Sequence, residues 1–138
     1  MAQYEISLYL AGEFKKQQMD DCFQADPEWC LEKGDKNSGG RIVDASLCNF
    51  ILKEGSVDDY LSPVFDECFE KLNMLICGVM KLRTLTSFES RLILVVRTDN
   101  RNPMPCFDLN HAIIELLFKS KTEFVLSPYH YEDLQDRD

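Results

Sequence analysis

The chain has 138 residues, a formal net charge of −9 and an apolar fraction of 45%. This length and composition predict one folded domain and exclude an intrinsically disordered chain. The longest apolar run, residues 92–96, is too short for a membrane span, and the negative charge disfavours direct binding to nucleic acid or to a membrane surface.

The cysteine pattern favours reduced thiols. Six cysteines occur, but no C-x-x-C pair is formed, and the N-terminal stretch lacks the pattern of a signal peptide. A chain of this size can bury a core without disulfide bonds. We therefore expect a cytoplasmic protein with free thiols, without a metal site and without another cofactor.

The first part of the chain predicts a strand, a short helix and a loop. Apolar side chains recur at every second position over residues 4–10, which is typical of a half-buried strand. Residues 14–23 favour a short helix that ends before the Asp26-Pro27 break. Residues 29–44 are rich in glycine and predict a loop without the spacing of a phosphate-binding motif. Trp29 is expected to anchor this loop by packing, with a ligand platform as the alternative.

Residues 45–52 predict a second strand, and residues 57–82 predict the helix on which the other elements pack. Apolar residues recur in this helix at three- and four-residue steps, so they form one stripe that must be buried. Pro63 fits the first position of the main helix if Ser62 caps it, after a short turn over residues 57–61. Asn73 or Gly78 is expected to bend the helix a second time.

The rest of the chain predicts a strand over residues 88–98, a helix capped by Asp108 or Asn110, and a last strand over residues 122–131. Pro128 predicts either an edge position for that last strand or the end of the strand. Residues 1–131 are expected to form a single α+β domain, and residues 132–138 an acidic flexible tail. The expected fold is a two-layer sandwich with a mainly antiparallel four-stranded sheet, helices on one face and a loosely ferredoxin-like arrangement.

No catalytic signature occurs in the sequence. His111 and His130 have no marked nucleophile or acid partner, and the serine-elbow, zinc-protease and deaminase motifs are absent. We therefore expect a protein that is not an enzyme. The enzymatic alternative requires a pocket that joins His130, Tyr129, Tyr131 and nearby carboxylates.

The excess negative charge lies in the first half of the chain. Residues 1–70 contain fifteen acidic and six basic side chains, a net charge of −9, whereas residues 71–138 contain nine of each. Such a charge distribution favours encounter with a basic partner, although it also serves solubility.

Acidic side chains are predicted on the outer face of the long helix. Asp59, Asp66 and Glu70 share this face, where like charges cost roughly a few tenths of a kcal/mol each. A basic partner would relieve the repulsion, and a solvated helix face is the alternative of equal weight. The candidate partner-binding residues are Asp58, Asp59, Asp66, Glu67 and Glu70, followed by the loop residues Glu32 and Asp35.

Short motifs along the chain resemble a known family. They are a first strand that ends in glycine, a proline-containing segment, a Lys-Gly-Asp loop, a strand followed by a long helix, and an apolar strand. The matching residues are Gly12, Phe14, Pro27, Lys33, Gly34, Asp35, Leu61, Leu72 and residues 92–96. In this order they resemble a family of small bacterial proteins described as a domain of unknown function. The resemblance implies that the protein occurs beside polymorphic toxins, where some similar proteins act as immunity proteins.

These observations together predict an immunity protein. It is expected to bind a cognate toxin domain, a basic nuclease in the simplest case, and to occlude the active-site surface of that toxin. The alternative is a non-catalytic adaptor or regulatory module that uses the same helix or an exposed sheet edge. Both alternatives leave the oligomeric state open.

Overall fold

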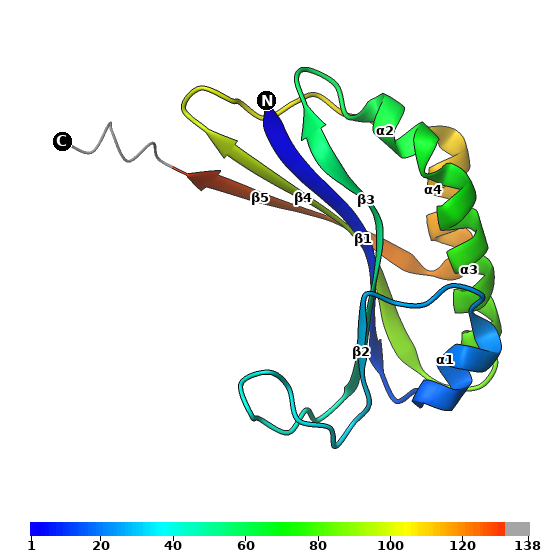
Figure 1. The fold of residues 1–138 in the computed structure, drawn as a ribbon. Helices are drawn as coiled ribbons and strands as arrows, with labels where there is room; N and C mark the ends of the chain where they lie inside the picture. Colours follow the sequence, from blue (N-terminus) through cyan, green and yellow to red (C-terminus); the bar gives the residue numbers. More distant parts are fainter. Residues whose placement is uncertain (132–138) are drawn as a thin grey trace.

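The computed structural model describes residues 1–131, so the predicted acidic tail lies outside the described residues. One sheet is covered on a single face by the helices, and the other face carries no helix among these residues (Figure 1). In chain order, the elements are β1 (Ala2–Gly12), α1 (Lys16–Cys22), β2 (Trp29–Leu31), β3 (Ser46–Val57), α2 (Ser62–Glu67), α3 (Phe69–Arg83), β4 (Phe88–Asp99), α4 (His111–Ser120) and β5 (Thr122–Tyr131).

The sheet has five strands in the order β2-β3-β1-β4-β5, one more than predicted. β1 pairs antiparallel with β3 and β4, β2 pairs antiparallel with β3, and β5 pairs parallel with β4. The α+β class and the mainly antiparallel sheet are therefore confirmed. β3 and β4 run parallel on either side of β1 and are joined by α2 and α3. This split βαβ unit is the part of the fold that matches a ferredoxin-like arrangement.

The additional strand is β2, which occupies part of the predicted glycine-rich loop. It contains only three residues, paired with Leu47, Cys48 and Asn49 of β3. A segment this short cannot display the two-residue alternation by which a strand is recognised in a sequence. The predicted position of β5 at the edge of the sheet is confirmed.

The core lies between the sheet and the helices. Ile6, Leu8 and Leu10 of β1 and Leu92 and Leu94 of β4 have no exposed surface and alternate with residues on the open face. The register between β1 and β3 shifts at the Ile6/Ser7 position, where β3 contains an extra residue. Such a bulge turns the following side chains to the opposite face.

The long predicted helix is divided into α2 and α3. The chain leaves helical geometry at Cys68, where φ is −98° and ψ is 5°, a break that was not predicted, and α3 then continues through Asn73 and Gly78. Pro63 lies in the first turn of α2 as predicted, but Leu61 occupies the cap position and the Ser62 hydroxyl contacts Asp108 instead. The apolar stripe is buried on both sides of the break.

Gly78 brings α1 close to α3. A Cβ atom at this position would overlap the ring of Phe23, which follows α1. The same ring packs on Phe50 of β3, with ring centroids 4.9 Å apart. Gly78 therefore allows the Phe23 ring, at the end of α1, to approach the backbone of α3 closely.

Arg83 joins the ends of four elements. Its guanidinium group donates hydrogen bonds to the carbonyl oxygens of Ser120 and Phe88 at 2.8 Å and to Ser90 Oγ at 2.7 Å. It also lies 4.4 Å from the centre of the Phe88 ring. Ser90 and Ser120 each contact the Thr122 hydroxyl at 2.8 Å. Burial lowers the pKa of Arg83, but its hydrogen bonds satisfy the buried groups around it.

Replacing Arg83 should destabilise the fold. Arg83→Ala leaves the Ser120 and Phe88 carbonyl groups without a donor, and we expect a loss of about 2–3 kcal/mol in the free energy of unfolding. Urea denaturation followed by circular dichroism measures it. Lys81→Ala is the matched control, because Lys81 lies in the same helical turn and is exposed. Equal stability of the two variants would contradict the assigned role of Arg83.

Candidate functional site

Asp58 and Asp59 lie before α2, not on the helix where they were predicted. An isolated β-bridge between Tyr60 and Cys106 follows them, in which the Asp59 carbonyl oxygen accepts a hydrogen bond from Cys106 N at 2.8 Å and Leu61 N donates to the Cys106 carbonyl oxygen at 2.9 Å. Both aspartates are exposed and line a small hollow together with Arg101. The prediction that Asp59 shares a helix face with Asp66 and Glu70 is therefore wrong.

Asp66 and Glu70 lie on either side of the break between α2 and α3, and both are exposed. Asp66 accepts a hydrogen bond from Asn110 Nδ2 at 2.7 Å, while Asn110 Oδ1 caps α4. Glu67, in contrast, forms an ion pair with Lys53 of β3. Among the predicted helix acids, Asp66 and Glu70 remain without a basic partner in the part of the chain that the structure describes.

Glu32 and Asp35 stabilise the loop that contains them. Asp35 Oδ2 lies 3.0 Å from Lys16 Nζ and accepts a hydrogen bond from Glu32 N at 2.9 Å. Glu32 Oε1 accepts a hydrogen bond from Lys16 N, also at 2.9 Å. The backbone hydrogen bond from Glu32, followed by the Lys16 ammonium, lowers the pKa of Asp35. Gly34 has a φ of 97°, which explains the glycine of the Lys-Gly-Asp loop.

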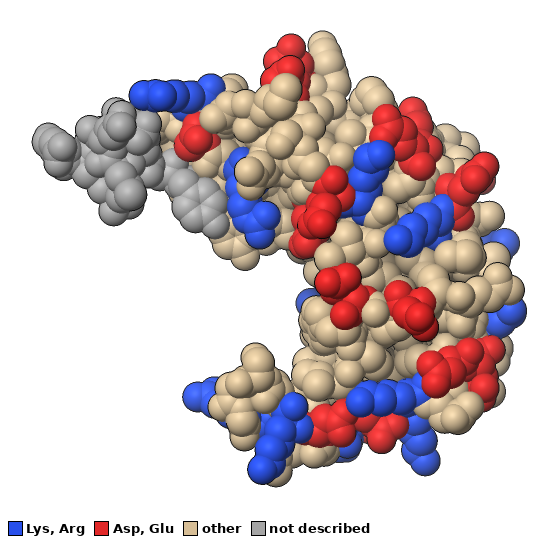
Figure 2. Space-filling view, in the orientation of Figure 1, with Lys and Arg blue, Asp and Glu red and all other residues tan. Residues whose placement is uncertain are grey.

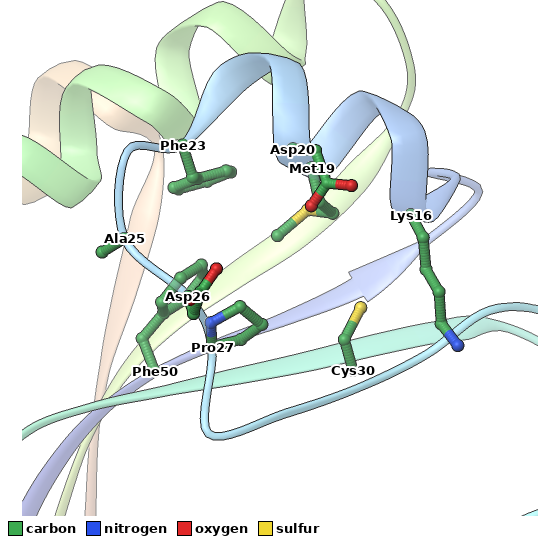
Figure 3. Close-up of a pocket in the computed structure, with 9 residues that line it drawn as sticks. All are labelled: Lys16, Met19, Asp20, Phe23, Ala25, Asp26, Pro27, Cys30 and Phe50. Atoms are coloured by element: carbon green, nitrogen blue, oxygen red, sulfur yellow. The ribbon is translucent and has the colours of Figure 1, made fainter.

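A cavity of about 330 Å³ lies between α1 and the strands β2 and β3 (Figure 3). Met19, Phe23 and Phe50 are buried and form its apolar floor. Asp20 from α1 and Asp26 from the following segment are exposed at its mouth. These two aspartates are not among the predicted site residues, because they line one cavity only after the chain returns from α1 toward β2.

The thiol of Cys30 lines one side of this cavity. Burial raises the pKa of Cys30, and burial also raises the pKa of Cys48, its partner on the adjacent strand. Both thiols are free, as are the other four cysteines. A thiol whose pKa is raised is protonated at neutral pH and behaves as a small apolar group. Cys30 therefore adds to the apolar surface of the cavity.

The open face of the sheet carries a second hollow, which Figure 2 shows between the sheet and the protruding loop. Its volume is about 480 Å³ and its lining includes Trp29, Leu31 and Leu47. The Trp29 ring packs edge-on against Tyr9 at 6.3 Å, yet 42% of Trp29 is exposed. Trp29 therefore packs against a neighbouring side chain, and the exposed part of its ring also lines the hollow.

Neither histidine shares a site with Tyr129. His130 contacts Thr98 Oγ1 at 3.2 Å and Asn100 Oδ1 at 3.1 Å through its two ring nitrogens. Tyr129 is adjacent to His130 on β5, so strand alternation directs the two side chains to opposite faces. His111 is exposed and lies 2.9 Å from Glu115. His130 and Tyr129 therefore do not face a common pocket.

Within residues 1–131, no cluster of three or more histidine, cysteine, aspartate or glutamate side chains has the arrangement of a metal site. No helix in the same range has the length and apolar character needed to cross a membrane. Comparisons with protein-family models, with curated proteins and with solved structures give no match to the chain.

The Asp35 interactions predict a pH dependence of stability. Because the folded-state pKa of Asp35 is lowered, its contribution is present above the ordinary aspartate value of about 3.9 and is lost as the pH falls through the folded value. The urea midpoint of Asp35→Asn should be lower than that of the wild type at pH 7, and the difference should shrink at about pH 3.

Asp44→Asn is the control for this comparison, since Asp44 is an exposed aspartate beyond the same loop. Its urea midpoint should follow that of the wild type at both pH values. A deficit of Asp35→Asn that stays constant with pH would contradict the ionic role of Asp35.

Proposed function

We propose that the chain is an immunity protein, which binds a cognate toxin domain and blocks it by occlusion. The toxin domain would be basic, and a nuclease is the specific form proposed, since a nuclease presents a basic surface to nucleic acid phosphates. Acidic side chains of the chain would occupy that surface. No catalytic step by the chain is needed for this mechanism.

The observation that carries the proposal is the exposed, unpaired state of Asp66 and Glu70. Within residues 1–131 neither carboxylate forms an ion pair, whereas Glu67 between them does. Figure 2 shows acidic groups over α2, over the start of α3 and over α1, with lysine and arginine groups between them. Charge complementarity of this kind raises the encounter rate and discriminates between partners.

The charge distribution and the family resemblance support the same proposal. All of the net charge of −9 is accounted for by residues 1–70, which include α1, β2 and the aspartates near α2. The Lys-Gly-Asp loop is part of the family resemblance, and its aspartate has a structural role here, because Asp35 forms an ion pair with Lys16. Similar proteins that occur beside polymorphic toxins include immunity proteins.

A non-catalytic adaptor or regulatory module is the second candidate. The exposed Trp29 and the hollow on the open sheet face favour it, since aromatic residues are enriched at protein interfaces. An adaptor that binds by this face would depend on apolar contacts. Its affinity would change little with salt, whereas a complex made through exposed carboxylates weakens as salt rises.

The two candidates are distinguished by a protection experiment. The chain is used to capture its partner from the source cell, and the partner is then expressed alone and together with the chain. If the chain is an immunity protein, the partner stops growth when it is expressed alone, and co-expression of the chain restores growth. A partner that is harmless when expressed alone contradicts the immunity proposal and leaves the adaptor.

Charge reversal tests the proposed surface. Asp66→Lys combined with Glu70→Lys should weaken binding to the partner at least about tenfold, because attraction is replaced by repulsion at two exposed positions. Binding is measured by surface plasmon resonance. Because Asp66 contacts Asn110, Glu70→Lys alone is also measured, and thermal unfolding verifies that each variant is folded.

The control is Glu115→Lys combined with Glu123→Lys, which changes the net charge equally at exposed positions of α4 and β5. It should bind as the wild type does within about twofold. Equal weakening by both double variants would indicate a general effect of net charge and would reject the assigned surface.

A further inference from the structure

The cavity between α1 and β2 combines an apolar floor with an acidic mouth. Its floor is apolar and buried, formed by Met19, Phe23 and Phe50. Its mouth carries two carboxylates, which come from different segments of the chain (Figure 3). A ligand that matches both parts must have an apolar stem and a positively charged end.

The carboxylates at the mouth are available for a ligand. Within residues 1–131 neither Asp20 nor Asp26 forms an ion pair, and both are exposed. Lys16 also lines the cavity, but its ammonium group is 3.0 Å from Asp35, and this contact raises the pKa of Lys16. In Figure 3 the Lys16 side chain is directed away from both aspartates. The mouth therefore presents net negative charge.

The cavity floor is rigid because its aromatic rings pack against other residues on the side away from the cavity. Phe23 packs against Gly78 of α3 on one side and against Phe50 on the other. Met19 adds a flexible thioether that adapts to the shape of a bound group. The volume of about 330 Å³ is at the lower end of the roughly 300–1,000 Å³ that is usual for small-molecule sites. One long side chain fits this space better than a nucleotide or another large cofactor.

We infer that this cavity receives an arginine side chain of the protein partner. The aliphatic stem of the arginine lies on Met19 and the Phe23 ring, and the guanidinium group donates hydrogen bonds to the carboxylates of Asp20 and Asp26. Arginine fits better than lysine, because its flat cation stacks on aromatic surfaces and donates to two carboxylates at once. Buried arginine anchors are also among the residues that dominate binding energy at interfaces.

This inference deepens the proposed function, since it rests on a basic protein partner and assigns one contact of that partner. The charge of the mouth excludes anionic occupants such as phosphates and carboxylates, which Asp20 and Asp26 would repel. The site is separate from Asp66 and Glu70, because it belongs to α1 and β2 and not to α2 and α3. The two regions can therefore be tested independently.

The test is a titration with a free arginine derivative. N-acetyl-arginine amide is added to the ¹⁵N-labelled chain, and the amide signals of Asp20, Asp26 and Cys30 are followed by NMR. Saturable shifts with a dissociation constant in the millimolar range are expected for such a small ligand. N-acetyl-citrulline amide has nearly the same shape without the charge, and it should bind at least about fivefold more weakly.

Substitutions locate the binding. Asp20→Asn combined with Asp26→Asn keeps the side-chain shapes and should abolish the preference for arginine over citrulline. Asp21→Asn is the matched control, because Asp21 follows Asp20 on α1 but does not line the cavity, and it should leave the titration unchanged. Thermal unfolding of each variant verifies the fold.

Three results would overturn the inference: no saturable shifts at these amides, equal binding of the arginine and citrulline derivatives, or an unchanged preference in Asp20→Asn/Asp26→Asn. Loss of binding in Asp21→Asn alone would overturn it as well. These outcomes differ from failure of the proposed function, which is decided by the toxicity of the captured partner. Arginine binding combined with a harmless partner would retain the site and reject the immunity role.

Discussion

Within residues 1–131, helices pack on one face of the sheet only, and this constraint positions the core and the cavity. The large apolar residues of β1 and β4 alternate with residues of the open face, so the buried apolar positions of these strands lie on the helix side. The helices must share that single face, and α1 approaches α3 where Gly78 leaves room for Phe23. This close contact forms the floor of the cavity and places Asp20 at its mouth.

The carboxylates of the chain fall into two groups that composition cannot distinguish. Asp35 and Glu67 are neutralised by Lys16 and Lys53, and they stabilise the loop and the contact between β3 and α2. Asp20, Asp26, Asp66 and Glu70 are exposed without such partners within residues 1–131. An ionic group that is already paired internally contributes little to a complex, since a partner would have to displace the existing lysine. The second group is therefore the part of the negative charge that remains for a partner.

Local patterns in the sequence predicted the elements better than they predicted the site. The edge strand β5 and the buried stripe of α2 and α3 follow from Pro128 and from helical periodicity, which depend only on nearby residues. The break at Cys68 was missed because apolar residues continue through it at helical spacing. Asp20 and Asp26 could not be brought together from the sequence, because the cavity that both line depends on the contact between Phe23 and Gly78, which are far apart in the sequence.

Zero-length cross-linking of the complex tests the central claim most directly. A carbodiimide joins a carboxylate to a lysine amine only when the two are in contact, and mass spectrometry identifies the joined residues. We predict that lysine residues of the partner become linked to Asp66 and Glu70, the exposed carboxylates at the junction of α2 and α3. Links that involve only Glu89 and Glu123, which neighbour Arg91 on the open face of the sheet, would contradict it.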